Sequence, residues 1–191
     1  MRAREMIVNA IKRSKDERGL RTSKPNNNLS KGHLGKADHN LIVMTDLSKL
    51  GHEDWTVITA YYAMYHSALA LLAKIGLESK DHATTAAILE YFFREQISKE
   101  MMGKFNQLKE KKDKIEDVTI KEKYIDYLWK AKRARETVQY GVPISYKEKD
   151  VIVNNAREFV SKIKLVISQL EDEFIEVIDK EIRELADTTL T

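Results

Sequence analysis

The chain has 191 residues, enough for one domain with a substantial core and too few for two domains of ordinary size. It contains no cysteine, which excludes disulfides and thiolate chemistry and is typical of a reducing, cytoplasmic location. The net charge of +3 is unevenly spread: residues 1–30 carry eight Lys/Arg and three Asp/Glu, whereas residues 171–191 carry two and eight. A basic end and an acidic end favour contacts with polyanions or with each other.

The first 29 residues are predicted to form a short basic helix followed by a linker. Ala3, Ile7 and Ile11 recur at helical spacing, and basic side chains fill the rest of the surface. Such a helix either docks on the rest of the protein or contacts phosphates or acidic lipid headgroups. Residues 16–29 contain Gly19, Pro25 and three asparagines, which is loop composition and predicts a linker or a flap.

The next two predicted helices include the longest uncharged stretch of the chain. Ser30 is a plausible N-cap of the first, and Gly51 suits its end. The second covers the uncharged run from Trp55 to Ala73, which as a helix would be roughly 28 Å long, enough to approach the span of a bilayer. Its tyrosines, threonines, serine and histidine would need partners in lipid, so we predict a buried helix of a soluble bundle with no membrane contact.

The polar rings of this central helix lie along two adjacent faces. Tyr61 and Tyr65 lie along one face, and Tyr62 and His66 along the next. We expect the polar tips of these rings to point toward bundle edges or a cleft, where they find partners.

The second half of the chain predicts three or more further helices. Asp81 is a candidate cap, residues 97–116 give a weaker helical pattern with a charge run, and Thr119 with Glu122 has capping-box spacing before a helix that ends at Gly141. A second capping box opens the last helix, whose apolar stripe continues to Leu185 without a glycine or proline. The chain is therefore predicted to be all-α, an up-and-down bundle of about five to six helices with a long C-terminal helix.

The last helix, if continuous to residue 186, would extend roughly 60 Å, about twice the diameter of a small domain. Its far end, with Leu170, Phe174, Ile178 and Ile182, must then be covered by other apolar surface. Either the N-terminal helix folds back on it or a second subunit supplies the same helix. We favour the second arrangement, a homodimer.

Several segments together resemble a known family. The central sequence AYYAMYHSALALL, followed by Gly76 and the step from Lys80 to His82, is similar to the core of HEPN domains, the higher eukaryote and prokaryote nucleotide-binding family of helical bundles. The segments HLGKADHNLIVMTDLSKLGHEDW, RETVQY and KDVIVNNAREFVSKI resemble other helices of that family, in its YYAMYH-type prokaryotic and archaeal branch. The resemblance covers residues 30–168 and leaves 1–29 as a basic N-terminal part and 169–191 as an acidic helical extension.

The resemblance implies two functions of different classes. HEPN domains act as dimeric modules beside a small nucleotidyltransferase, often as toxin and antitoxin, or as metal-free ribonucleases with an arginine four to six residues before a histidine. No arginine in this chain has a histidine at that distance; Arg135 precedes Tyr140 instead, and a tyrosine with a pKa of about 10 is a poor base near neutrality. This argues against nuclease activity, although an unusual active site using Tyr140, His66 or His82 stays open.

The remaining motifs predict a binding site and no metal or cofactor. There is no glycine-rich phosphate loop, no HExxH and no Cys/His cluster with metal spacing. Basic residues beside a tyrosine suit phosphate contacts and base stacking, although a solvated, ion-paired helix face is an equal alternative. The candidate residues for binding nucleotide or RNA are Tyr62, His66, His82, Lys130, Arg133, Arg135 and Tyr140.

Overall fold

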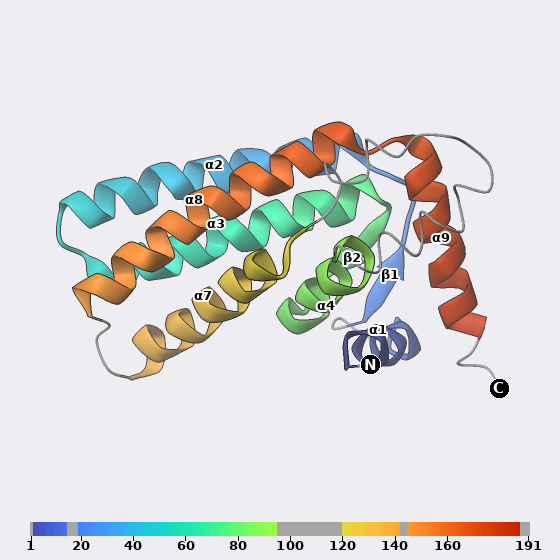
Figure 1. Ribbon diagram of the computed structural model, residues 1–191, viewed down its shortest axis with the longest axis horizontal. Helices are drawn as coiled ribbons and strands as arrows, with labels where there is room; N and C mark the ends of the chain where they lie inside the picture. The colour runs from blue at the N-terminus through green and yellow to red at the C-terminus, as the bar shows by residue number, and fades with distance from the viewer. Residues whose placement is uncertain (1, 15–18, 95–119, 142–144, 188–191) are drawn as a thin grey trace.

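The computed structural model describes residues 2–14, 19–94, 120–141 and 145–187 and is almost entirely helical in these ranges (Figure 1). This confirms the predicted all-α class. The expected helix over residues 97–116 lies outside the described residues, as does Thr119. The helix expected to start after Thr119 begins instead at Glu122 with Lys121 as its N-cap, because Ile120 pairs with Arg94 in a β-bridge. The helices are α1 (Arg2–Lys12), α2 (Asn27–Lys49), α3 (Glu53–Lys74), α4 (His82–Phe93), α7 (Glu122–Tyr140), α8 (Tyr146–Gln169) and α9 (Asp172–Asp187).

Helix α3 is the centre of the bundle. Helices α2 and α8 run beside it along its length, and α7 and α4 pack on its other side (Figure 1). Thirteen of its 22 residues are buried, many of them alanines, whose small side chains let neighbouring helices approach closely. By length and hydropathy α3 could cross a membrane, but 72% of its most apolar window is buried inside the protein. The run from Trp55 to Ala73 is therefore accounted for as a core helix.

Local capping explains where three of the described helices begin and where α2 ends. The side chain of Asp81 accepts a hydrogen bond from the Thr84 amide, and Ser145 forms the expected capping box with Glu148. Gly51 follows α2 with a φ of +76°, as its predicted stop position requires. The prediction that Ser30 caps α2 was wrong: Asn26 accepts from the Leu29 amide at 2.9 Å, and Ser30 is buried within the helix.

A small sheet replaces part of the expected linker. Strand β1 (Leu20–Thr22) pairs antiparallel with β2 (Leu77–Ser79), with Arg21 opposite Glu78. Gly76, at a φ of +74°, turns the chain from α3 into β2, and its carbonyl accepts a hydrogen bond from the Ser23 amide at 2.8 Å. The composition of residues 16–29 did not reveal this strand, because its pairing partner lies more than fifty residues away in the sequence.

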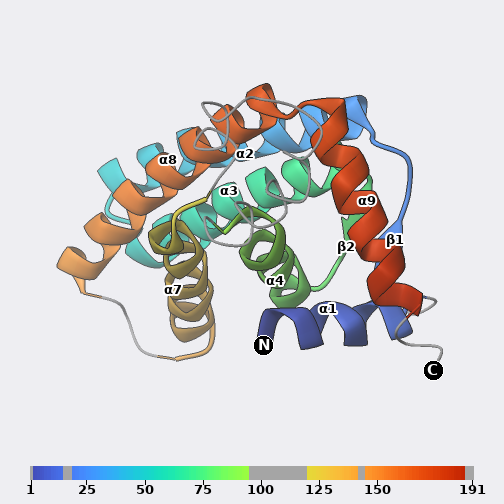
Figure 2. The ribbon, with the colours of Figure 1, turned by 45° about the vertical axis from the view of Figure 1, so that its right-hand side comes forward.

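The prediction of one continuous last helix was also wrong. Helix α8 ends at Gln169, Leu170 is extended with ψ of 116°, and α9 turns back across the end of the bundle (Figure 2). The bend buries Leu170 and places the apolar face of α9 against α1 and α4, where the rings of Phe93 and Phe174 are 5.9 Å apart. Burial of this face outweighs the local tendency of the sequence to continue as one helix.

The two oppositely charged ends of the chain meet at this point. Helix α1 lies across α4 and α9 (Figure 2), and the Tyr91 hydroxyl of α4 donates to the Glu181 carboxylate of α9 at 2.7 Å. Burial and this carboxylate raise the pKa of Tyr91 to about 12. Buried residues from Ala3 to Leu185 belong to one core cluster, so the apolar surface from which a homodimer was predicted is covered within the chain.

Candidate functional site

The most unusual polar group of the bundle is the side chain of Arg135 on α7. Its Cζ lies 5.3 Å from the centre of the Tyr61 ring, and its Nη1 donates to the Tyr62 hydroxyl at 3.4 Å. Its Nε is buried and has no hydrogen-bond partner among the described residues. Beside it on α7, Lys132 and Glu136 pair at 2.6 Å. The guanidinium is thus held by aromatic rings with donor capacity left over.

His82 completes this group from the start of α4. Its Nδ1 shares a hydrogen bond with the Tyr61 hydroxyl, and its ring centre is 4.1 Å from that of Tyr65. Burial, followed by the nearby Arg135 charge, lowers the pKa of His82, whereas burial raises the pKa of Tyr61. Both rings are therefore uncharged near neutrality, and we call Tyr61, Tyr62, His82 and Arg135 the arginine cluster.

A histidine pair lies further along the same side of α3. The Nδ1 atoms of His33 on α2 and His66 on α3 are 3.2 Å apart, and the rings stack with centres separated by 5.4 Å. Burial, then the neighbouring histidine and Lys36, lowers the pKa of His66 to about 4, and burial and Lys36 also lower the pKa of His33. Both imidazoles are neutral at pH 7, so one donates its Nδ1 proton to the other.

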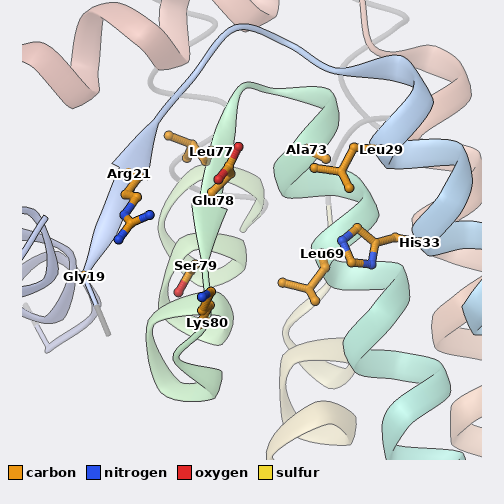
Figure 3. A pocket seen from close by; sticks show the side chains of 10 residues that line it. All are labelled: Gly19, Arg21, Leu29, His33, Leu69, Ala73, Leu77, Glu78, Ser79 and Lys80. Carbon is orange, nitrogen blue, oxygen red and sulfur yellow. The ribbon is translucent and has the colours of Figure 1, made fainter. Parts of the chain in front are cut away.

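An open hollow of about 250 Å³ adjoins the histidine pair (Figure 3). Its walls are strand β2, the start of α2 and the last turns of α3. The side chains of Leu29, His33 and Leu69 point from the helices toward β2, and charged side chains stand at the rim (Figure 3). The lining residues are Gly19, Arg21, Leu29, His33, Leu69, Ala73, Leu77, Glu78, Ser79 and Lys80.

The arginine cluster and the hollow are joined along one face. The Tyr62 ring, which receives the Arg135 hydrogen bond, is 6.5 Å from the ring of His66, and His66 contacts His33 at the edge of the hollow. The model of the HEPN domain family matches residues 30–166, which include most of this face. The chain belongs to the HEPN domain family. A search of the curated proteins found no match for it.

Membership of the HEPN family confirms the resemblance and indicates a nucleotide- or RNA-related function in general terms. The assignment to the YYAMYH-type branch stays a prediction. The matched region also ends close to the predicted boundary at residue 168, and it leaves out α1, β1 and α9.

The HEPN fold brings together four of the seven predicted site residues. Tyr62, His82 and Arg135 belong to the arginine cluster, and His66 follows at the histidine pair. The other three do not join them. Lys130 and Arg133 are exposed on the opposite face of α7, since helical steps of five and two residues from Arg135 rotate by roughly 140° and 160°. Tyr140 is 79% exposed at the end of α7.

Two functional candidates were missed from the sequence. Tyr61 was not among the predicted site residues, although it lies between Arg135 and His82. His33 was not among them either, because its partner His66 is on another helix, α3. The expectation that the polar tips of the α3 rings find partners at a bundle edge or a cleft was the signal available for Tyr61.

The side chains on this face are of kinds that bind phosphates and bases. Among the described residues no group of three or more His, Asp or Glu side chains is arranged to hold a metal ion. The face instead offers one held guanidinium, half-buried rings and neutral imidazoles. These groups suit phosphate oxygens and the faces and edges of bases.

Proposed function

We propose that this HEPN protein binds RNA or nucleotide through the arginine cluster and acts as a binding module without nuclease activity. The observation that carries the proposal is the half-buried Arg135 side chain, which among the described residues donates a hydrogen bond to the Tyr62 hydroxyl although a guanidinium has five N–H donors. Guanidinium groups suit the oxygens of phosphate, so a held arginine with donors left over, in a family of nucleotide-related function, favours a phosphate ligand.

Geometry supports a phosphate at this position. Tyr61 and Tyr62 fix the guanidinium plane, which lowers the conformational cost of ordering it on binding. Tyr62 and His66 are half-buried and offer ring surface beside it, whereas Tyr61 is 1% exposed and serves only as support. A strand of RNA is therefore expected to place a phosphate on Arg135 and a base near Tyr62.

Replacing Arg135 by alanine is expected to weaken RNA binding roughly tenfold to a hundredfold, because a hydrogen bond to a charged group contributes about 1.5–3 kcal/mol. The slope of log Kd against log salt concentration should decrease by the amount that corresponds to about one phosphate contact. Filter binding of single-stranded RNA at several salt concentrations measures both quantities.

Arg133→Ala is the matched control, since it removes the same charge from the exposed face of α7. Arg135→Lys keeps the charge and loses the planar fork, and it should bind with intermediate affinity. Equal affinities of the Arg133→Ala and Arg135→Ala proteins, both folded by circular dichroism, would reject the cluster as the binding site.

A metal-independent ribonuclease is the second candidate, favoured by one specific observation. Arg135 and His82 come from α7 and α4 and meet at Tyr61, although the sequence lacks the family's arginine-histidine spacing. The lowered pKa of His82 leaves its imidazole neutral at pH 7, the form that can accept a proton, while Arg135 could offset charge on the phosphate.

An RNA-cleavage assay in EDTA separates the two candidates. We expect no turnover, which would leave binding as the function. Turnover abolished by His82→Ala and retained in His39→Ala, whose side chain is exposed on α2, would instead establish the nuclease. Turnover unaffected by His82→Ala would be attributed to a contaminating enzyme.

We also propose that the module acts in the cytoplasm as a homodimer beside a nucleotidyltransferase, as the family resemblance implies. Exposed apolar side chains at one end of the bundle support a protein partner there: Leu50, Trp55 and Val151 are 70, 62 and 53% exposed. Light scattering should give about twice the chain mass of 22.1 kDa, and Trp55→Glu should lower it toward one chain. A wild-type mass of one chain at micromolar concentration would refute the homodimer.

A further inference from the structure

We propose that the hollow between β2 and the α2–α3 pair binds a free mononucleotide, with the base against its apolar floor and the phosphate at its rim. The inference rests on the proposed recognition of nucleotides and assigns a second place for it, separate from the arginine cluster. The two places are distinct in their residues: none of the residues that line the hollow belongs to that cluster.

The shape and lining of the hollow suit one planar ring system. Leu29, Leu69, Ala73 and Leu77 provide apolar surface from α2, α3 and β2. A volume of about 250 Å³ lies just below the range of drug-sized ligand pockets, which begins at roughly 300 Å³. A single base fits this space, whereas successive bases of a polymer do not. The ribose and phosphate would then lie at the open side.

His33 supplies a directed polar group to this apolar space. Its Nδ1 faces His66 at 3.2 Å, which leaves Nε2 as the nitrogen on the side of the hollow (Figure 3). If His66 donates its Nδ1 proton, Nε2 of His33 carries a hydrogen and donates; if His33 donates, Nε2 accepts. The pair can therefore match either a carbonyl or an amino group on a base edge when both rings change tautomer, each losing a proton from one ring nitrogen and gaining one on the other through water.

Charges at the rim favour an anionic group on the ligand. Arg21 and Lys80 are exposed beside the hollow, and neither forms an ion pair within the part of the chain that the structure describes. Glu78 stands opposite Arg21 in the sheet and can accept hydrogen bonds from ribose hydroxyls. Two cations against one carboxylate, with neutral His33 inside, suit the phosphate of a mononucleotide more than an uncharged nucleoside.

Isothermal titration calorimetry with AMP, GMP, CMP and UMP tests the proposal. We expect at least one to bind, and its Kd to rise tenfold or more in Leu69→Trp, which fills the hollow, and in Arg21→Ala. The matching nucleoside should bind more weakly than the mononucleotide. Leu165→Trp, at an exposed position of α8, is the matched control and should bind as wild type. His33→Gln gives a second, less bulky variant, and thermal melting confirms that each variant is folded.

The outcomes separate this site from the proposed function. The inference is overturned if the wild-type protein binds none of the mononucleotides. It is also overturned if Leu69→Trp and His33→Gln leave mononucleotide binding unchanged. RNA filter binding with Arg135→Ala decides the proposed function independently. Mononucleotide binding lost in Leu69→Trp and kept in Arg135→Ala supports the inference, even if RNA does not bind.

Discussion

Replacing Lys149 by methionine is expected to lower the free energy of unfolding by about 3 kcal/mol. Lys149 is fully buried at the start of α8, where its Nζ lies 3.0 Å from Glu53 Oε2, 3.2 Å from Asp150 Oδ1 and 3.2 Å from Ser48 Oγ. It thereby joins α8 to the turn between α2 and α3. Removing the cation leaves the Glu53 carboxylate without its partner, and since that side chain is 28% exposed, water offsets part of the cost.

Urea denaturation of the two proteins measures this change in stability. Lys147→Met is the control, because Lys147 is exposed on the same helical turn, and it should stay within about 0.5 kcal/mol of wild type. If Lys149→Met were as stable as that control, the buried ion pair between α8 and the α2–α3 turn would contribute nothing to the free energy of unfolding.

Gly76→Ala is expected to lower the free energy of unfolding by about 3 kcal/mol, from two separable causes. A φ of +74° costs an alanine roughly 1 kcal/mol, and the added Cβ would lie 2.5 Å from the Ser23 carbonyl oxygen, a clash with backbone that costs roughly 1–3 kcal/mol more. The substitution pushes β1 away from β2, so it should also disturb the hollow that these strands help to form.

Gly51→Ala isolates the first cause. Gly51 has nearly the same φ, +76°, but a Cβ there would meet nothing within 4 Å, so we expect a loss of only about 1 kcal/mol. The difference between the two variants in urea denaturation reports the clash with Ser23. Equal losses of stability in the two variants would mean that β1 moves away from the added Cβ at Gly76 without a measurable cost in free energy.

Local signals predicted the helices well. The uncharged run from Trp55 to Ala73 predicted α3 within two residues at each end, and Asp81 and Ser145 cap the helices that follow them. These features depend on hydrogen bonds within a few residues and on one segment's own periodicity. The errors at Ser30 and at residues 16–29 arose where another cap or a distant strand competed with the local preference.

The candidate site was predicted in part. Tyr62, His66 and His82 were chosen from helical phase and from the family resemblance, and the structure places them along one face with Arg135. Lys130 and Arg133 were included because they are close to Arg135 in sequence. Basic residues that are close in sequence can nevertheless lie on opposite faces of a helix, as these do. Applying the helical rotation of about 100° per residue would have separated them.

The sequence by itself determined which segments are helical, that α3 is a buried core helix, and the family. Only the tertiary structure decided that His33 meets His66, that Arg135 lies over Tyr61, and that the chain bends at Leu170. These features join helices far apart in the chain, and the relative rotation and offset of packed helices depend on side chains from both partners. Periodicity within one segment carries no information about that offset.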